Sequence, residues 1–180
     1  MSTNLNNMTD EEKYLLLELS YLNIPLKYDK KDYSINTVLN KIINENKLEH
    51  DVLYDDAVRI LEKLKKYPHL GELTLVAYRN NNAHDPHSNT TAEPKTGFVG
   101  YVLENKVGNR FFLFRGTEPS TMDKFTQDMT DNVRSTLFGD SPQVREAKAF
   151  FDKHKVIGKD NFFLVIQKEA ILYQKYMWLT

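Results

Sequence analysis

The strongest constraint on the fold is an apolar run that leads directly into a glycine turn. Residues 111–114 read Phe-Phe-Leu-Phe, and Arg115, Gly116, Thr117 and Glu118 follow. Consecutive apolar residues bounded by a turn signal are typical of a buried strand. Gly116 permits a sharp turn at the strand end. The sequence therefore predicts a buried strand that ends in a glycine turn, with a hydroxyl group and a charged side chain directly after the glycine.

Composition limits the class of protein. A chain of 180 residues is long enough for one domain with one core. The 24 Lys and Arg residues balance 25 Asp and Glu residues, so no nucleic-acid partner is predicted. Zero cysteines exclude disulfides and thiolate metal sites. Residues 1–9 are polar, without a signal-peptide core, and no apolar run is long enough to span a membrane, which predicts a cytoplasmic or leaderless secreted protein.

The N-terminal region, residues 1–67, is predicted to be helical. Thr9 and Glu12 have the spacing of a capping box, and leucines then recur at helical spacing. We expect this first helix to end near Asn23, ahead of a proline. Further helices are expected to begin at Ser34 and at Asp55 or Asp56.

Residues 72–166 are predicted to form a sheet with one covering helix. Gly108 lies in a short connection that predicts an antiparallel hairpin. Ser141-Pro142 predicts the start of a helix that Gly158 closes, and this helix joins two strands by a right-handed crossover to a parallel neighbour. The predicted class is α/β in a single domain over residues 1–180. Strands are expected at residues 73–78, 98–103, 111–114 and 162–166.

Part of this region resembles a known family. The segments Gly97–Tyr101 and Phe114–Glu118 resemble the hairpin and the Phe-Arg-Gly-Thr/Ser signature of fungal-lipase-like (class 3 lipase) α/β hydrolases, in particular the uncharacterised bacterial lipase-like group. The segment Asp128–Asn132 resembles an acidic segment of these proteins, with Met129 in place of the usual tryptophan. The resemblance covers residues 97–166 and implies an incomplete α/β-hydrolase-like sheet.

The resemblance also implies roles for five residues. The Thr117 backbone amide would belong to an oxyanion hole, and Gly116 would form the turn that aims it. Each such donor stabilises the tetrahedral intermediate of ester hydrolysis by roughly 3–4 kcal/mol. Arg115 would pair with Asp128 or Asp131 to fix the loop. Full-length relatives would hydrolyse carboxylic esters, with lipid esters among the candidates, and without a cofactor.

The sequence contains no nucleophile elbow. A hydrolase of this type needs a serine between glycines directly after a strand, but Gln167, Lys168 and Glu169 follow the last predicted strand. All seven serines and all five histidines precede that point. We therefore expect this chain to be catalytically inactive.

Two explanations of the missing elbow remain open. One is a frameshift near codon 166, which would make residues 167–180 an unrelated tail and the chain a truncated hydrolase. The other is a small non-catalytic binding or regulatory protein on a partial hydrolase scaffold. The frameshift is favoured because the tail contains aromatic residues and none of the residues that typically form a turn after a strand. It predicts glycine-rich nucleophile residues in another reading frame of the downstream DNA.

A second cluster has metal-ligand residue types. His84, Asp85 and His87 lie close together, with Glu93 nearby. Zinc needs three or four ligands held rigidly. The surrounding Asn, Ser and Thr residues favour a solvated loop, so no metal and no cofactor are predicted.

Overall fold

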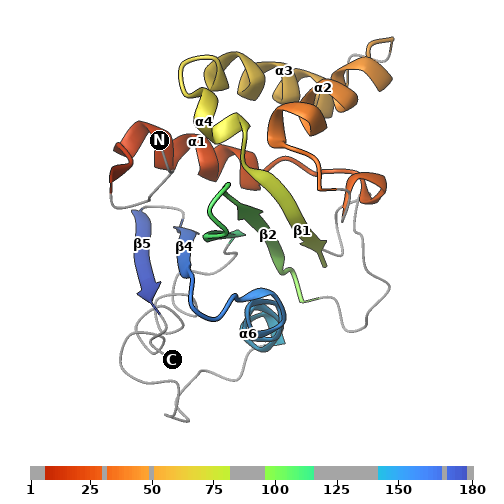
Figure 1. Ribbon diagram of the computed structural model, residues 1–180. Coiled ribbons are helices and arrows are strands. Elements are labelled where there is room, and N and C mark those ends of the chain that lie inside the picture. The colour runs from red at the N-terminus through yellow and green to blue at the C-terminus, as the bar shows by residue number, and fades with distance from the viewer. Residues whose placement is uncertain are drawn as a thin grey trace.

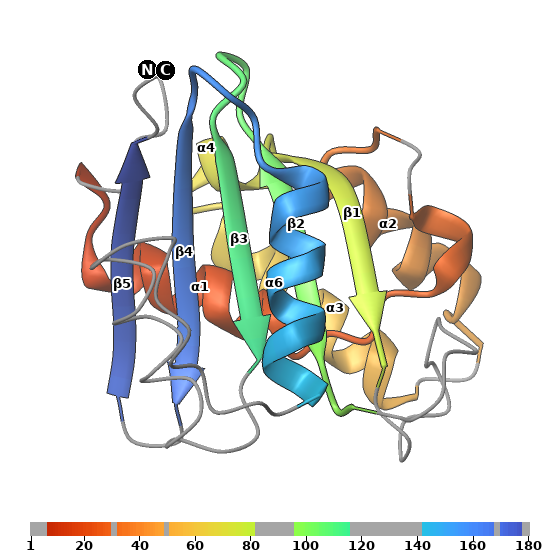
Figure 2. The ribbon, with the colours of Figure 1, turned by 90° about the horizontal axis from the view of Figure 1, so that it is seen from below.

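The computed structural model describes residues 7–29, 32–48, 51–81, 96–115, 142–167 and 170–177. A five-stranded mixed sheet lies between two helical layers, with α1 to α4 over one face and α6 over the other (Figures 1 and 2). This arrangement confirms an α/β fold with an N-terminal helical region. Among the described residues, no helix is both long and apolar enough to cross a bilayer.

Helix α1 spans Asp10–Ser20 and begins at the predicted capping box. The Thr9 hydroxyl accepts a hydrogen bond from the Glu12 amide at 3.3 Å, and the Glu12 carboxylate accepts one from the Thr9 amide at 2.7 Å. The helix ends at Ser20, earlier than predicted, because the chain leaves the helical hydrogen-bond pattern at its C-cap, Tyr21.

The other N-terminal helices follow a short 3₁₀ turn, η2 (Leu26–Tyr28). Helix α2 (Ile35–Glu45) begins at its predicted N-cap, Ser34. The predicted start of the third helix was wrong. Helix α3 spans Val52–Leu64, and its N-cap is Asp51, whose carboxylate accepts from the Tyr54 amide at 2.8 Å. Asp55 and Asp56 lie inside this helix, after its first three residues, so neither can be the N-cap residue that precedes the helix. A short helix, α4 (Pro68–Gly71), was not predicted.

The sheet has the order β1-β2-β3-β4-β5. The first three strands form an antiparallel meander, which confirms the predicted hairpin, and β4 lies parallel to β3, which confirms the crossover. Gly108 takes a φ of 84° in the hairpin turn, a conformation that favours glycine. The strands are β1 (Thr74–Asn80), β2 (Val99–Glu104), β3 (Arg110–Arg115), β4 (Asp160–Gln167) and β5 (Ala170–Met177).

The crossover helix α6 spans Pro142–His154. The predicted cap Ser141 lies outside the described residues, and the predicted closure at Gly158 was wrong. Gly158, with a φ of 77°, lies instead in the turn into β4. Asn161 holds that turn, because its buried side chain donates to the Val156 carbonyl at 2.9 Å and accepts from the Val156 amide at 3.1 Å.

The segment after β4 is part of the sheet. The frameshift explanation would make residues 167–180 an unrelated tail, and within this segment Ala170–Met177 forms β5 and pairs antiparallel with β4 along eight residues. The physical reason is that an uncovered strand presents a row of free amides and carbonyls to any extended segment nearby. β5 therefore covers the edge of β4 that the predicted truncated sheet would have exposed.

The core is divided by the sheet into two layers, and alternate phenylalanines of adjacent strands fill each one. Phe111 stacks on Phe162 at 5.1 Å on the side of α1, and Phe112 stacks on Phe163 at 5.2 Å on the side of α6. All four rings are at most 1% exposed. Burial on both faces explains why these strands are apolar without alternation.

The tyrosine Tyr101 ties α1 to the sheet. Its side chain is fully buried, its ring lies 4.7 Å from the Tyr78 ring, and its hydroxyl donates to the Leu22 carbonyl just after α1. Burial, and next the neighbouring Tyr78, raise the pKa of the Tyr101 hydroxyl well above its usual value.

Replacing Tyr101 by Phe tests this link. The loss of the hydroxyl leaves the Leu22 carbonyl without its partner and should lower the free energy of unfolding by about 1–2 kcal/mol at neutral pH. Because the folded-state pKa is raised, the neutral hydroxyl contributes its full stability below the unfolded pKa of about 10, and this contribution is lost as the pH rises further. Urea unfolding from about pH 8 to 11 should therefore show a smaller alkaline loss in the variant. Parallel pH profiles would contradict the assignment.

Candidate functional site

The carboxyl ends of β3 and β4 meet at one edge of the sheet. Register places Asn80, Val99, Arg115 and Ile166 side by side across the first four strands at this edge. Helix α6 begins beside the same edge (Figure 2). In open α/β sheets, ligands commonly bind outside the carboxyl ends of parallel strands. This edge is therefore the first candidate site.

Arg115 is the predicted site residue that the structure describes. Its guanidinium lies 5.6 Å from the centre of the Tyr21 ring, and Tyr21 is the C-cap of α1. A cation at this place is favoured both by the aromatic face and by the negative end of the helix dipole. The structure thus brings together a strand end and a helix end that are 94 positions apart in the sequence.

The remaining predicted site residues lie outside the described part of the chain. These are Gly116, Thr117, Asp128 and Asp131, so the oxyanion hole and the Arg115 ion pair stay predictions. The cluster of His84, Asp85, His87 and Glu93 also lies outside it. Within the described ranges, no three carboxylate or histidine side chains are grouped to hold a metal ion.

A part-buried polar cluster at this edge was missed by the sequence analysis. The Glu146 side chain of α6 is 10% exposed and accepts three hydrogen bonds from described residues. Its carboxylate accepts hydrogen bonds from the Arg79 guanidinium, from the Asn81 side-chain amide at 2.8 Å and from the Thr96 hydroxyl. One carboxylate therefore fixes the position of α6 relative to the end of β1 and the approach to β2.

The backbone supports the same cluster. The backbone amide of Asn81 donates to the Phe98 carbonyl at 2.7 Å, and the backbone carbonyl of Asn81 accepts from the Gly97 amide at 2.9 Å. A partial signal was present in the sequence, since Arg79, Asn80 and Asn81 follow an apolar run. It gave no means of selecting Glu146, which lies 65 residues away, from the other acidic residues.

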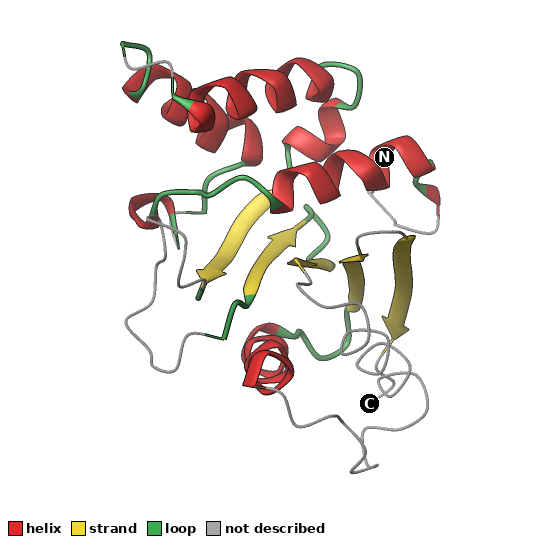
Figure 3. Cartoon of the chain, turned by 180° about the vertical axis from the view of Figure 1, so that it is seen from behind, coloured by secondary structure: helices red, strands yellow, loops and turns green. Residues whose placement is uncertain are grey.

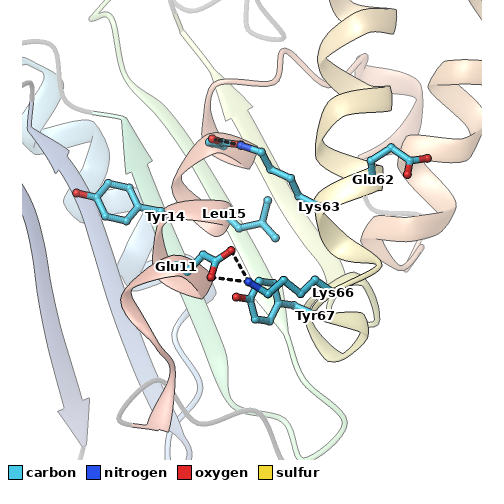
Figure 4. A pocket seen from close by; sticks show the side chains of 8 residues that line it. Glu11, Tyr14, Leu15, Glu62, Lys63, Lys66 and Tyr67 are labelled. Atoms are coloured by element: carbon cyan, nitrogen blue, oxygen red, sulfur yellow. Dashed lines mark hydrogen bonds and ion pairs between the residues drawn. The ribbon is translucent and has the colours of Figure 1, made fainter.

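A second candidate is a groove of about 410 Å³ between α1 and the end of α3 (Figure 4). Leu15 lies within it, and Tyr14 and Tyr67 are aromatic lining residues. Two ion pairs cross from α1, Glu11 to Lys66 at 2.8 Å and Glu18 to Lys63 at 2.6 Å. The groove has the size of many small-molecule sites. The remaining lining residue is Glu62.

Comparison with known proteins gives no assignment: no family model, no curated protein and no solved structure matches the chain.

The Glu146 cluster can be tested by removing its carboxylate. Glu146→Ala removes the carboxylate that accepts from the Arg79 guanidinium, the Thr96 hydroxyl and the Asn81 side-chain amide, and should lower the free energy of unfolding by about 2 kcal/mol. This value is below the roughly 3–5 kcal/mol of a fully buried pair because Arg79 is 38% exposed and can be hydrated. Urea denaturation measures the change.

The matched control is Glu72→Ala, which breaks the exposed pair with Lys106 at 2.9 Å. That change should cost at most about 1 kcal/mol. Equal losses in the two variants would contradict a structural role for the Glu146 cluster.

Proposed function

We propose that this chain carries the oxyanion-hole side of a lipase-like serine hydrolase fold and does not itself hydrolyse esters. In this proposal Thr117 supplies the backbone amide of the hole and Gly116 the turn. Full-length relatives would act on carboxylic esters, lipid esters among them. The basis is the motif Phe114–Glu118 together with the position of the strand that delivers it.

One observation carries the proposal. β3 and β4 are parallel neighbours, with Arg115 opposite Ile166, so the chain leaves β3 next to the end of β4. A serine hydrolase needs this adjacency, because the amide that stabilises the oxyanion must lie close to a nucleophile on the turn after the neighbouring strand. The position of α6 between these strands in the sequence is also consistent with the proposal.

The proposed lack of catalysis rests on residue types. Gln167 ends β4 and Lys168 and Glu169 follow it, and none of the three has a hydroxyl or thiol that could act as the nucleophile. None of the serines follows β4 in the sequence. A hole without a nucleophile can bind a carbonyl oxygen but cannot form an acyl-enzyme.

A second candidate function is a non-catalytic binding or regulatory module on the same scaffold. The pairing of β5 with β4 along eight residues favours it. A strand in this position covers the edge of the sheet, which suits a stable protein better than an interrupted one. This candidate and the inactive-hydrolase proposal share the scaffold and differ in whether the chain folds as an independent unit.

Engineered cysteines test the proposed placement of Thr117. The natural chain has no cysteine, so Thr117→Cys combined with Lys168→Cys introduces the sole pair of thiols. If Thr117 lies beside the turn after β4, a disulfide should form on mild oxidation, because bridging needs Cα atoms within about 7 Å. Mass spectrometry and gel mobility report the crosslink, and Thr117→Cys with Lys155→Cys, at the opposite end of β4, is the control.

Ester assays of the natural chain test the proposed lack of catalysis. The natural chain should give no turnover of p-nitrophenyl esters above buffer and no labelling by a serine-directed phosphonate. Crosslinking equal to the control would remove the oxyanion-hole placement. Turnover blocked by the phosphonate would instead overturn the claim of inactivity.

Removal of residues 168–180 separates the two candidates. The binding-module candidate predicts that the full chain unfolds in one cooperative urea transition, and that the shortened chain loses stability and associates through the bared edge of β4. Light scattering and circular dichroism measure both effects. A full chain that unfolds without cooperativity, or a shortened chain of equal stability, would count against the module.

A further inference from the structure

The groove between α1 and α3 already holds an ammonium group of the protein itself. The Lys66 Nζ lies 2.8 Å from both carboxylate oxygens of Glu11 and 5.2 Å from the centre of the Tyr67 ring (Figure 4). A carboxylate on one side and an aromatic face on another are the two features that recognise organic cations. The intramolecular contact therefore shows which ligand chemistry this position accepts.

The carboxylates that line the groove are each paired with a basic side chain. Glu18 binds Lys63 and Arg59, Glu62 binds Lys65, and Glu11 binds Lys66 beside the Tyr67 ring. The groove also lies at the C-terminal end of α3, whose C-cap is Lys65 and whose dipole adds negative potential there. The hydrogen bond from Lys66 is the foremost cause that lowers the pKa of Glu11, so this carboxylate is charged at neutral pH.

The internal ammonium group can be displaced. The side chains of Lys66 and Glu11 are 64% and 61% exposed, so their ion pair is solvated. Pairs of this kind contribute little net stability because water competes for both groups. The volume of about 410 Å³ leaves room for a small molecule once Lys66 swings out.

We propose that this groove binds a small organic ammonium ion, with Glu11 as its counter-ion and Tyr67 as its aromatic wall. Lys66 is the built-in competitor that occupies the position when the ligand is absent. Tyr14 and Leu15 contact the apolar body of the ligand. This site is separate from the carboxyl edge of the sheet, and no residue assigned to the hydrolase proposal lines it, so the two proposals fail independently.

The test uses the full chain and benzyltrimethylammonium as the probe, followed by amide chemical shifts. We expect saturable shifts among residues 11–18 and 62–67, in contrast to benzyl alcohol and benzoate, which have the same ring without the positive charge. Glu11→Gln should weaken binding and Lys66→Met should strengthen it, each by about two- to five-fold, which is the range of an exposed ion pair.

The control for net charge is Lys106→Met. It removes the same charge from an exposed pair with Glu72 at 2.9 Å, away from the groove, and should leave the dissociation constant unchanged. The amide spectra also report whether each variant is folded. Tyr67→Leu, which keeps an apolar side chain without the ring, should weaken binding and provides an independent variant.

Opposite effects of Glu11→Gln and Lys66→Met support the proposal, because a purely structural ion pair would respond in the same direction to loss of either partner. Three results would overturn it: no saturable response to the cation, equal or tighter binding of benzoate, or changes of the same sign in the two variants.

Discussion

The parallel pairing of β3 with β4 is the contact on which the other features of this fold depend. It joins segments about fifty residues apart, and stacked phenylalanines bury its central part on both faces. Phe111 and Phe162 face the N-terminal helices, and Phe112 and Phe163 face α6. Without this pairing, Phe151 of α6 would lose its contact with Phe163, and the ends of β3 and β4 would not lie side by side.

The polar and aromatic side chains near the carboxyl edge of the sheet come from three separate elements. Arg115 comes from β3, Tyr21 from the end of α1, and Glu146 from α6. On one face of the sheet, the Tyr101 hydroxyl donates to the carbonyl of Leu22, just after α1. On the other face, the Glu146 carboxylate of α6 accepts from the side chain of Asn81, just after β1. This arrangement at the carboxyl edge is compatible with a non-catalytic binding protein as well as with a hydrolase.

The N-terminal helices have a surface chemistry of their own. α1 lies over one face of the sheet (Figure 3). Its Glu18 pairs with Lys63 of α3, and its Glu11 pairs with Lys66, just after α3 (Figure 4). The groove beside these ion pairs has aromatic walls, and its carboxylates are paired with basic side chains. Its chemistry differs from that of the sheet edge, so a single ligand type for both places is not expected.

The sequence by itself determined the elements whose causes are local. The capping box of Thr9 and Glu12, the cap at Ser34, the glycine hairpin and the apolar strands all follow from residues within a few positions of one another, and all are present. The start of α3 was misplaced because several aspartates near it can act as a cap, and the backbone path selects among them.

The tertiary structure alone decided the long-range contacts. Glu146 meets Asn81 and Thr96, Arg115 meets Tyr21, and residues 170–177 become a strand because β4 offers them an edge. These contacts depend on how separated segments meet in space, and many acidic or aromatic residues in the sequence would have served equally well. Local propensity sets which segments can form, and the burial of shared surfaces sets which of them become neighbours.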